Sequence, residues 1–335
     1  MKNIYVSGIA GLVGSNVAKN LISKGYNVKG CDNLIGGYES NIPENCEWAN
    51  IDILDLNNLS DHMKDCDTII HCAALAYEGL SVFSPKLVTE NIYTGSISVM
   101  TAAIKNGLTK FINCSSMARY GNQKPPFTEK MKTNPVDPYG MAKAQAEQAL
   151  NLLSEIHGVK IYTVVPHNII GVGQRYDDPF RNVIAIFINR LLQGKSVYVY
   201  GDGQQKRSIS YIQDCVNPIT QLIEDDKFNT GIVFNIGPDD NEMTIEDLVK
   251  LVGFHCDIKP EINFIDPRPC EVKNAWCSSN KAKETLNYNP ITSLDEGMKI
   301  MIQWIRDRGT LPFNYDLPIE IINERTPKTW TNKLI

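Results

Sequence analysis

The 335-residue sequence is poor in the features that mark membrane, metal-binding and nucleic-acid-binding proteins. It has no apolar run long enough to span a bilayer and no signal-peptide pattern at its start. Its nine cysteines form no CxxC pair and have no histidine partners at zinc spacing. Basic residues do not outnumber acidic ones, and the net charge of −5 is unsuited to binding a phosphate backbone. We therefore expect a cytoplasmic protein with reduced, mostly buried thiols, no metal, and neither a membrane nor a nucleic acid as partner.

The sequence also lacks internal repeats and low-complexity segments, and its composition is that of a soluble globular protein. Hydrophobic residues make up 43% of the chain and charged residues 21%. A chain of this length can bury a large core and forms one large domain or two.

The strongest local motif is a glycine-rich turn near the start of the chain. The apolar run that ends at Ser7 predicts a strand, and the amphipathic stretch 15–24 predicts a helix. Between them, Gly8 would permit the turn, Gly11 would let the backbone approach a phosphate, and Gly14 would let helix and strand pack closely. The spacing differs from G-x-G-x-x-G, and a plain βα turn is the alternative to a dinucleotide site. The cofactor contacts expected at this turn are Gly8, Gly11, Leu12, Val13 and Gly14.

Strand-like and helix-like runs alternate through the first half of the chain. The apolar runs predict strands at 27–32, 49–53, 68–74, 110–116 and 161–167. Helices are predicted from Pro85 to Gly107 and from Pro138 to about Ile156. This alternation predicts an α/β fold with a Rossmann-type doubly wound parallel sheet.

The alternation fades after residue 165. Short strands are predicted at 197–200, 208–212 and 233–236, and helices at 180–193, 245–252 and 294–308. We expect residues 1–165, with parts of 208–236 returning to it, to form the dinucleotide-binding domain. Residues 166–207 and 237–335 are expected to form a smaller, discontinuous α/β substrate-binding domain over the carboxyl edge of the sheet.

Asp32 ends the second predicted strand, 18 residues after Gly14. A carboxylate at this point accepts hydrogen bonds from both adenosine ribose hydroxyls and repels a 2′-phosphate. No arginine follows at once to offset that repulsion, so we expect NAD and not NADP. The alternative is that Asp32 only begins a turn with Asn33.

A second motif combines Tyr139 and Lys143, four residues apart on a predicted helix, with Ser116, which ends a strand 23 residues before the tyrosine. An ammonium near a phenol favours the phenolate and lowers the phenol pKa, so Tyr139 is a candidate general base. Ser116 is a candidate hydrogen-bond partner of the reacting oxygen. The alternative is a solvated helix face beside a polar strand end.

With these motifs, the sequence resembles the extended short-chain dehydrogenases/reductases, and among them the nucleotide-sugar 4-epimerases of the UDP-glucose 4-epimerase type. The resemblance extends over nearly the whole chain. By this resemblance Asp52 and Ile53 flank the adenine, and Lys143 also holds the nicotinamide ribose. The matching segments are the glycine turn, Asp32, Asp52-Ile53, His71-Cys72-Ala73-Ala74, Asn91, Ser115-Ser116-Met117-Ala118-Arg119-Tyr120-Gly121 and Tyr139-x-x-x-Lys143. The further cofactor contacts implied are Asn33, Cys72, Ala73, Ala74, Asn91, Ser115, Tyr139 and Pro166.

The resemblance also implies substrate contacts. Arg207 and Arg268 match the diphosphate-binding arginines of the family, and two guanidinium groups suit a diphosphate. Glu271 fits a contact with the nucleotide ribose. The expected substrate-binding residues are Ser116, Tyr139, Asn168, Asn182, Val183, Arg207, Arg268 and Glu271.

Two histidines and the C-terminal segment stay outside this assignment. His71 lies within an apolar strand, which is typical of a core histidine. His167 ends a strand at the expected cleft, where contact with the sugar or nicotinamide and simple packing are both open. The segment 312–335 matches no motif, and packing on the substrate-binding domain is our expectation for it.

The resemblance implies an NAD-dependent epimerase that inverts C4 of a nucleoside-diphosphate hexose. Tyr139 would take the proton of the 4-hydroxyl with help from Ser116, the C4 hydride would pass to NAD, and both would return on the opposite face of a 4-keto sugar. A nucleotide-sugar dehydrogenase or ketoreductase and a non-catalytic NAD-binding protein are the alternatives. A 4,6-dehydratase or a decarboxylase is disfavoured, because Met117 and Ala118 after Ser116 cannot move protons.

The resemblance further implies a homodimer, because a helix pair of the family makes a two-fold interface. The matching helices are predicted at 85–105 and 138–154. We expect an apolar outer face on each of them. The candidate contact residues are Ala102, Ala144, Ala149 and Leu150.

Overall fold

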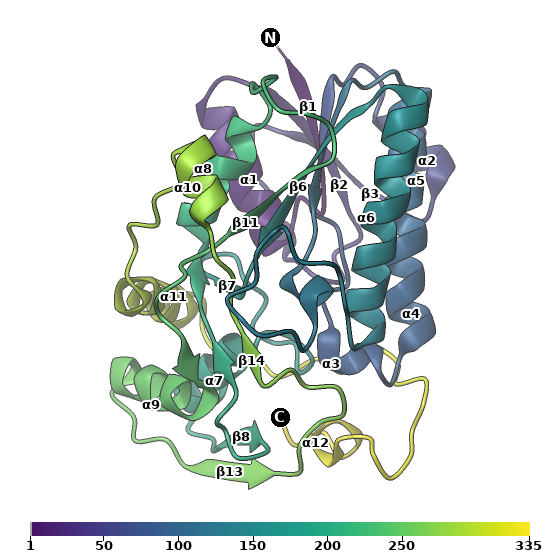
Figure 1. Ribbon diagram of the computed structural model, residues 1–335. Helices are drawn as coiled ribbons and strands as arrows, with labels where there is room; N and C mark the ends of the chain where they lie inside the picture. Colours follow the sequence, from purple (N-terminus) through teal and green to yellow (C-terminus); the bar gives the residue numbers. More distant parts are fainter. Residues whose placement is uncertain (1) are drawn as a thin grey trace.

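The computed structural model describes residues 2–335 and is built on a seven-stranded parallel sheet (Figure 1). The strand order is β11-β6-β5-β4-β1-β2-β3, and all neighbouring strands are parallel. The order reverses direction at β1, so the carboxyl ends of β1 and β4 border the crevice in which such sheets bind ligands. The Rossmann-type fold is thereby confirmed. The strands are β1 (Asn3–Ser7), β2 (Asn27–Asp32), β3 (Glu47–Asn50), β4 (Thr68–His71), β5 (Lys110–Cys114), β6 (Lys160–Pro166) and β11 (Ile232–Ile236).

Helices cover both faces of this sheet (Figure 1). Strand side chains alternate between the faces, so Ile4 and Val6 join the core cluster that holds α1, whereas Tyr5 joins the cluster that holds α5. A sheet covered on both faces has continuous apolar strands, which is the pattern in the sequence. One face carries α1 (Leu12–Ser23) and α8 (Ile212–Gln221), and the other carries α2 (Leu56–His62), α5 (Gly95–Lys105) and α6 (Pro138–His157).

The second half of the chain adds short sheets and helices beyond the carboxyl edge of the large sheet (Figure 1). The short sheets are β7 (Ile169–Ile170) with β10 (Ser210–Tyr211), β8 (Val197–Tyr200) with β13 (Ile262–Ile265), and β9 (Lys206–Arg207) with β12 (Met243–Thr244) and β14 (Asn274–Ala275). The longer helices are α7 (Val183–Leu192), α9 (Ile245–Cys256) and α11 (Leu294–Arg308). Shorter helical segments occur in both halves of the chain. Those of the first half are η1 (Glu39–Asn41), α3 (Glu78–Ser81), α4 (Pro85–Thr89), η2 (Glu90–Thr94) and η3 (Met117–Tyr120), and those of the second half are α10 (Asn280–Leu286) and α12 (Lys328–Thr331).

Several element boundaries differ from those predicted. The predicted helix at 180–193 begins only at Val183, because the Asn182 side chain caps it by accepting a hydrogen bond from the backbone N–H of Ile184 (3.0 Å). The predicted strand at 208–212 is reduced to β10, and α8, which contains Pro218, was not predicted at all. The predicted strand at 49–53 is shifted towards the N-terminus, and the one at 68–74 is shorter, since the chain leaves the sheet after Asn50 and His71.

The C-terminal segment joins the two halves of the molecule. The Glu320 carboxylate accepts hydrogen bonds from the backbone N–H groups of Lys86 and Leu87 (both 3.0 Å), at the start of α4. At the end of the chain, Arg190 of α7 donates to the Leu334 carbonyl (2.8 Å). The segment therefore packs on the first half of the chain as well as on the second.

Three of the four residues that we expected to contact a second subunit are buried within the chain. Ala102, Ala144 and Leu150 are fully or almost fully buried, because they face the sheet and neighbouring helices of the same chain. They are not available to a partner. The exposed apolar side chains of α6 are instead Met141, Leu152 and Ile156.

Within residues 2–335, no helix combines the length and the apolar character that crossing a membrane requires. The nine cysteines are all free thiols, and most are buried.

The packing of α1 on β1 yields a stability prediction. Gly14 has no room for a side chain, because an added Cβ would overlap the Gly8 carbonyl, whereas at Gly11 the same atom would stand 3.3 Å from that carbonyl. We expect Gly14→Ala to lower the free energy of unfolding by about 1–3 kcal/mol, a typical effect of overpacking. Gly11→Ala is the matched control on the same turn and should change stability much less. Urea unfolding of the cofactor-free proteins measures both, and equal stabilities would contradict the packing argument.

His71 yields a prediction on pH. It is buried between two hydroxyls, with Nδ1 2.8 Å from Ser7 Oγ and Nε2 3.0 Å from Ser96 Oγ, and burial lowers its pKa to about 3. The unfolded chain binds a proton near pH 6.5 and the folded one does not, so stability is present above that pH and is lost as the pH falls. This histidine should remove about 2 kcal/mol of stability between pH 7 and pH 5. Urea titrations should show a smaller loss in His71→Gln, and an unchanged loss in the exposed control His157→Gln.

Candidate active site

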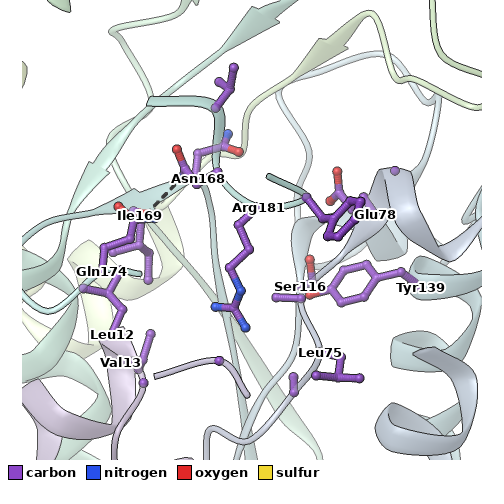
Figure 2. Close-up of a pocket in the computed structure, with 18 of the residues that line it drawn as sticks. Leu12, Val13, Leu75, Glu78, Ser116, Tyr139, Asn168, Ile169, Gln174 and Arg181 are labelled. Atoms are coloured by element: carbon purple, nitrogen blue, oxygen red, sulfur yellow. Dashed lines mark hydrogen bonds between the residues drawn. The ribbon is translucent and has the colours of Figure 1, made fainter. Parts of the chain in front are cut away.

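One cavity of about 420 Å³ lies between the carboxyl edge of the sheet and the second half of the chain. It brings together almost every site residue that the sequence indicated, and Figure 2 labels ten of its lining residues. The expected residues that line it are Gly8, Gly11, Leu12, Val13, Gly14, Asp32, Asn33, Ile53, Cys72, Ala73, Ala74, Asn91, Ser115, Ser116, Tyr139, Lys143, Pro166, Asn168, Asn182, Val183, Arg207, Arg268 and Glu271.

The glycine turn presents the N-terminus of α1 to this cavity. Gly8 has a φ of +75°, which few other residues adopt, and its N–H donates to the Cys31 carbonyl (2.8 Å). Leu12 and Val13 begin α1 directly at the cavity wall (Figure 2). The first N–H groups of a helix have no partner within the helix, so this end of α1 suits an anion.

Asp32 stands at the end of β2 with both carboxylate oxygens held in place. They accept hydrogen bonds from the backbone N–H groups of Ala10 (2.9 Å) and Leu34 (2.8 Å). Burial raises the pKa of Asp32, and these two hydrogen bonds lower it. Each oxygen keeps a second lone pair, so the fixed carboxylate can still accept from two ribose hydroxyls.

Asp52 is the exception among the expected cofactor contacts, because it does not line the cavity. Its carboxylate accepts hydrogen bonds from the Asn33 side chain (2.8 Å) and from the Leu54 N–H (2.9 Å). Ile53, the next residue, does reach the cavity wall. Asp52 therefore orients Asn33.

Asn91 supports the cavity wall from a helix with an irregular turn. It lies in η2, a π-helical turn between α4 and α5, and its Oδ1 accepts from the Leu75 N–H (2.9 Å). Such π-bulges in helices often occur at functional sites. The predicted helix from Pro85 to Gly107 did not include this interruption.

The candidate catalytic residues come from α6 and from the end of β5. Asp137 caps α6 by accepting from the Gly140 N–H (2.8 Å), and Tyr139 and Lys143 follow on one side of the helix. Ser116 caps η3, with its Oγ 3.2 Å from the Ala118 N–H, and stands beside the Tyr139 ring (Figure 2). The two hydroxyl groups therefore face the same part of the cavity.

The electrostatics of Tyr139 differ from the expectation. Burial raises the pKa of Tyr139, and its hydrogen bonding with Ser116 is the largest effect that lowers it. The cation among the main influences on Tyr139 is Arg181 and not Lys143, whose ammonium donates to the Cys114 carbonyl (2.9 Å). The lowering of the Tyr139 pKa by Lys143 stays a prediction, and Lys143 is not among the main influences on that pKa in this structure.

The two expected diphosphate arginines, Arg207 and Arg268, also line the cavity. Arg207 donates to the Val272 carbonyl (2.7 Å) and to the Lys206 and Lys273 carbonyls (2.9 and 3.3 Å), so its charge is held by neutral acceptors. Arg268 forms an ion pair with Glu271 (3.0 Å). Glu271 thus positions an arginine in addition to any contact of its own.

The segment after β6 divides into residues that reach the cavity and one that does not. Asn168 and Asn182 line it, each held by backbone contacts: the amide N–H groups donate to the Ser208 carbonyl (2.9 Å) and the Ile169 carbonyl (3.3 Å). His167 is buried away from the cavity lining, with Nε2 3.0 Å from the Pro238 carbonyl. Packing is therefore the role that the structure gives His167.

Two charged residues that sequence reasoning missed point into the cavity, Glu78 and Arg181 (Figure 2). Glu78 begins α3, and the charges of Arg207 and Arg268 act on its carboxylate. Arg181 precedes the cap of α7. Neither belongs to a motif, and only the folded chain brings them to Tyr139.

The cavity fits NAD on three observations. A cradle without side chains faces it at Gly8 and Gly14, the N-terminus of α1 suits a diphosphate, and the fixed Asp32 carboxylate suits ribose hydroxyls.

Comparison with known proteins also indicates that the chain belongs to a family that uses NAD. Residues 4–237 match the family model of the NAD dependent epimerase/dehydratase family. A putative UDP-glucose 4-epimerase of Methanocaldococcus jannaschii is 30% identical over 91% of this chain and 99% of its own length. A UDP-N-acetyl-alpha-D-glucosaminuronate decarboxylase of Bacillus cytotoxicus is 30% identical over 91% of this chain and 98% of its own.

Among solved structures, UDP-glucose 4-epimerase of Thermotoga maritima, determined with UDP-glucose, superposes with a TM-score of 0.86 at 31% identity, covering 91% of this chain and 99% of that one. The family match, the relatives and the site geometry agree. The chain belongs to the NAD-dependent epimerase/dehydratase family, and its cofactor is NAD.

Proposed function

We propose that this protein is an epimerase that inverts C4 of a nucleoside-diphosphate hexose, with a UDP-sugar as the substrate class. The observation that carries the proposal is that Ser116 and Tyr139 share one cavity with Arg207 and Arg268. A sugar nucleotide held by the two arginines extends its sugar into the same space as the two hydroxyl groups. The similarity to UDP-sugar 4-epimerases supports the choice of reaction and nucleotide.

The chain supplies proton transfer, orientation and charge to this reaction. Bound NAD supplies the redox chemistry at C4 of the sugar. Tyr139 takes the proton of the 4-hydroxyl, and Ser116 hydrogen-bonds the reacting oxygen. Burial opposes formation of the phenolate, whereas Ser116 and Arg181 favour it, so both neighbours help Tyr139 to act as a base. After the 4-keto sugar has turned over, C4 is reduced on its opposite face and Tyr139 returns the proton to the C4 oxygen.

The first functional prediction concerns Tyr139. Tyr139→Phe keeps the buried ring and removes the hydroxyl, so the rate should fall by about 10²–10⁴-fold, the usual contribution of general acid–base catalysis. Affinity for UDP should change little, because Arg207 and Arg268 are on other elements. Turnover of UDP-hexoses and calorimetric binding of UDP measure the two effects. A variant with nearly full activity would rule out Tyr139 as the base.

The second concerns Arg207. Arg207→Gln should weaken UDP binding by about 10–100-fold, because charge-assisted hydrogen bonds to an arginine fork contribute roughly 1.5–3 kcal/mol. The exposed Arg325→Gln is the matched control and should bind UDP as the unchanged protein does. Equal affinities in both variants would show that the diphosphate lies elsewhere.

The position of Glu78 supports a second candidate function within the same family, decarboxylation or dehydration of a nucleotide sugar. Decarboxylation and dehydration need an acid or base besides Tyr139, and the argument against them was that Met117 and Ala118 cannot supply one. Glu78 brings a carboxylate to the cavity from α3 instead. The similarity to a uronate decarboxylase adds to this alternative.

Product masses separate the two reactions. For the epimerase we expect a product of unchanged mass, and Glu78→Gln should retain most of the activity. A product lighter by carbon dioxide or water, formed by the unchanged protein and lost in Glu78→Gln, would instead establish the second candidate. The assay uses mass spectrometry of UDP-hexose and UDP-hexuronate reactions.

We also propose a homodimer, by the resemblance to the family. The exposed Met141, Leu152 and Ile156 on α6 supply an apolar surface for it. Light scattering at micromolar concentration tests the mass.

A further inference from the structure

Arg181 is a cation in the middle of the cavity that the motifs do not explain. Its side chain extends from the segment before α7 and ends between the Leu12–Val13 turn and the Ser116–Tyr139 pair (Figure 2). The side chain is only 16% exposed. A buried charge of this kind needs a compensating partner.

The partners within the chain fix one side of the guanidinium. Asp178 Oδ2 lies 3.4 Å from Arg181 Nε, and the guanidinium carbon lies 4.9 Å from the centre of the Tyr77 ring. The same carboxylate already accepts from the Tyr77 hydroxyl (2.6 Å) and from the Phe180 N–H (2.9 Å). Arg181 Nε has no hydrogen bond within 2–335, although it is buried. The internal pairing is therefore incomplete.

The far end of Arg181 reaches the loop after β2. An added Cβ at Gly36 would overlap Arg181 Nη2, so the guanidinium lies directly against the backbone of Gly36. The two segments are also tied by Arg175, which donates to the Leu34 and Ile35 carbonyls (3.1 and 2.7 Å), and by Tyr38, which donates to Asp177 (2.7 Å). Arg181 is thus held across the dinucleotide side of the cavity by a fixed framework.

The charge of Arg181 acts on both ends of the expected cofactor site. Burial raises the pKa of Asp32, and Arg181 is one of the groups that lower it. Burial likewise raises the pKa of Tyr139, and Arg181 again lowers it. The guanidinium is therefore close enough to act on both the carboxylate that suits the adenosine ribose and the tyrosine at the reacting end. In a dinucleotide, the part between the two riboses is the diphosphate.

We propose that Arg181 binds the diphosphate of NAD from the side opposite the N-terminus of α1. The helix end and the guanidinium enclose the diphosphate between two positive groups, and the planar fork suits paired phosphate oxygens. Because the next residue, Asn182, caps α7 and lines the same cavity, one short segment contacts the cofactor and borders the substrate. This arrangement retains NAD during turnover. The inference concerns the cofactor and holds whichever nucleotide sugar is converted.

The test measures NAD binding and not activity. Arg181→Gln removes the charge, and Arg181→Lys keeps a charge without the fork. We expect the glutamine variant to be purified with much less NAD per chain, and its dissociation constant for added NAD to rise by about 10–100-fold, with a smaller rise for the lysine variant. Chromatography of the released cofactor and calorimetry provide the two readouts. The exposed Arg325→Gln is the control, with unchanged NAD content.

UDP and a UDP-hexuronate serve as the competing anions. We expect both Arg181 variants to bind UDP and the hexuronate as the unchanged protein does, because Arg207 and Arg268 are retained. Unchanged NAD binding with weakened hexuronate or UDP binding would overturn the proposal and assign Arg181 to the substrate. Thermal unfolding shows whether the glutamine variant folds. If it does not, the binding of NAD, UDP and the UDP-hexuronate is compared in the lysine variant instead. An unaltered NAD affinity of the lysine variant would equally overturn the proposal.

Discussion

The close contact between Gly14 and the Gly8 carbonyl is the constraint on which the site depends. It lets α1 begin directly over the carboxyl end of β1, and an added methyl group at Gly14 would push the two apart. The N-terminus of α1 then faces the crevice where the strand order reverses. A parallel sheet brings the ends of β2, β4 and β5 to the same edge, and with them Asp32, Cys72 and Ser116.

The cavity is completed by segments that come from far along the chain. Arg207, Arg268 and Arg181 belong to three separate segments of the second half, and each is held by carbonyl or carboxylate groups before any ligand is considered. This fixed arrangement reduces the entropy lost when a ligand orders flexible side chains. The C-terminal segment adds to it, because Glu320 binds the start of α4 while Ile335 lines the cavity. The two halves are therefore tied together on both sides of the site.

The sequence was most informative where one residue type has a local meaning. The glycine turn, Asp32 at a strand end and the Tyr139–Lys143 spacing each follow from backbone geometry, and the cavity contains all of them. The sequence was least informative about residues whose partners lie far away along the chain. Arg181 and Glu78 have no motif, and their charge matters only because α3 and the segment before α7 meet beside Tyr139. The electrostatics of Tyr139 were hard to predict for the same reason, since burial and charges from other segments, Glu78 and Arg181, act on its pKa.

The proposed epimerase reaction is tested most directly by the fate of the hydrogen at C4 of the sugar. A UDP-hexose carrying deuterium at C4 is incubated with the protein and its bound NAD, and the product is analysed by chromatography, mass spectrometry and NMR. For an epimerase we expect a C4-inverted product of unchanged mass that keeps the deuterium at C4, with no NADH released, because Tyr139 exchanges only the hydroxyl proton. Loss of deuterium from C4, or release of deuterated NADH with a 4-keto sugar, would contradict it.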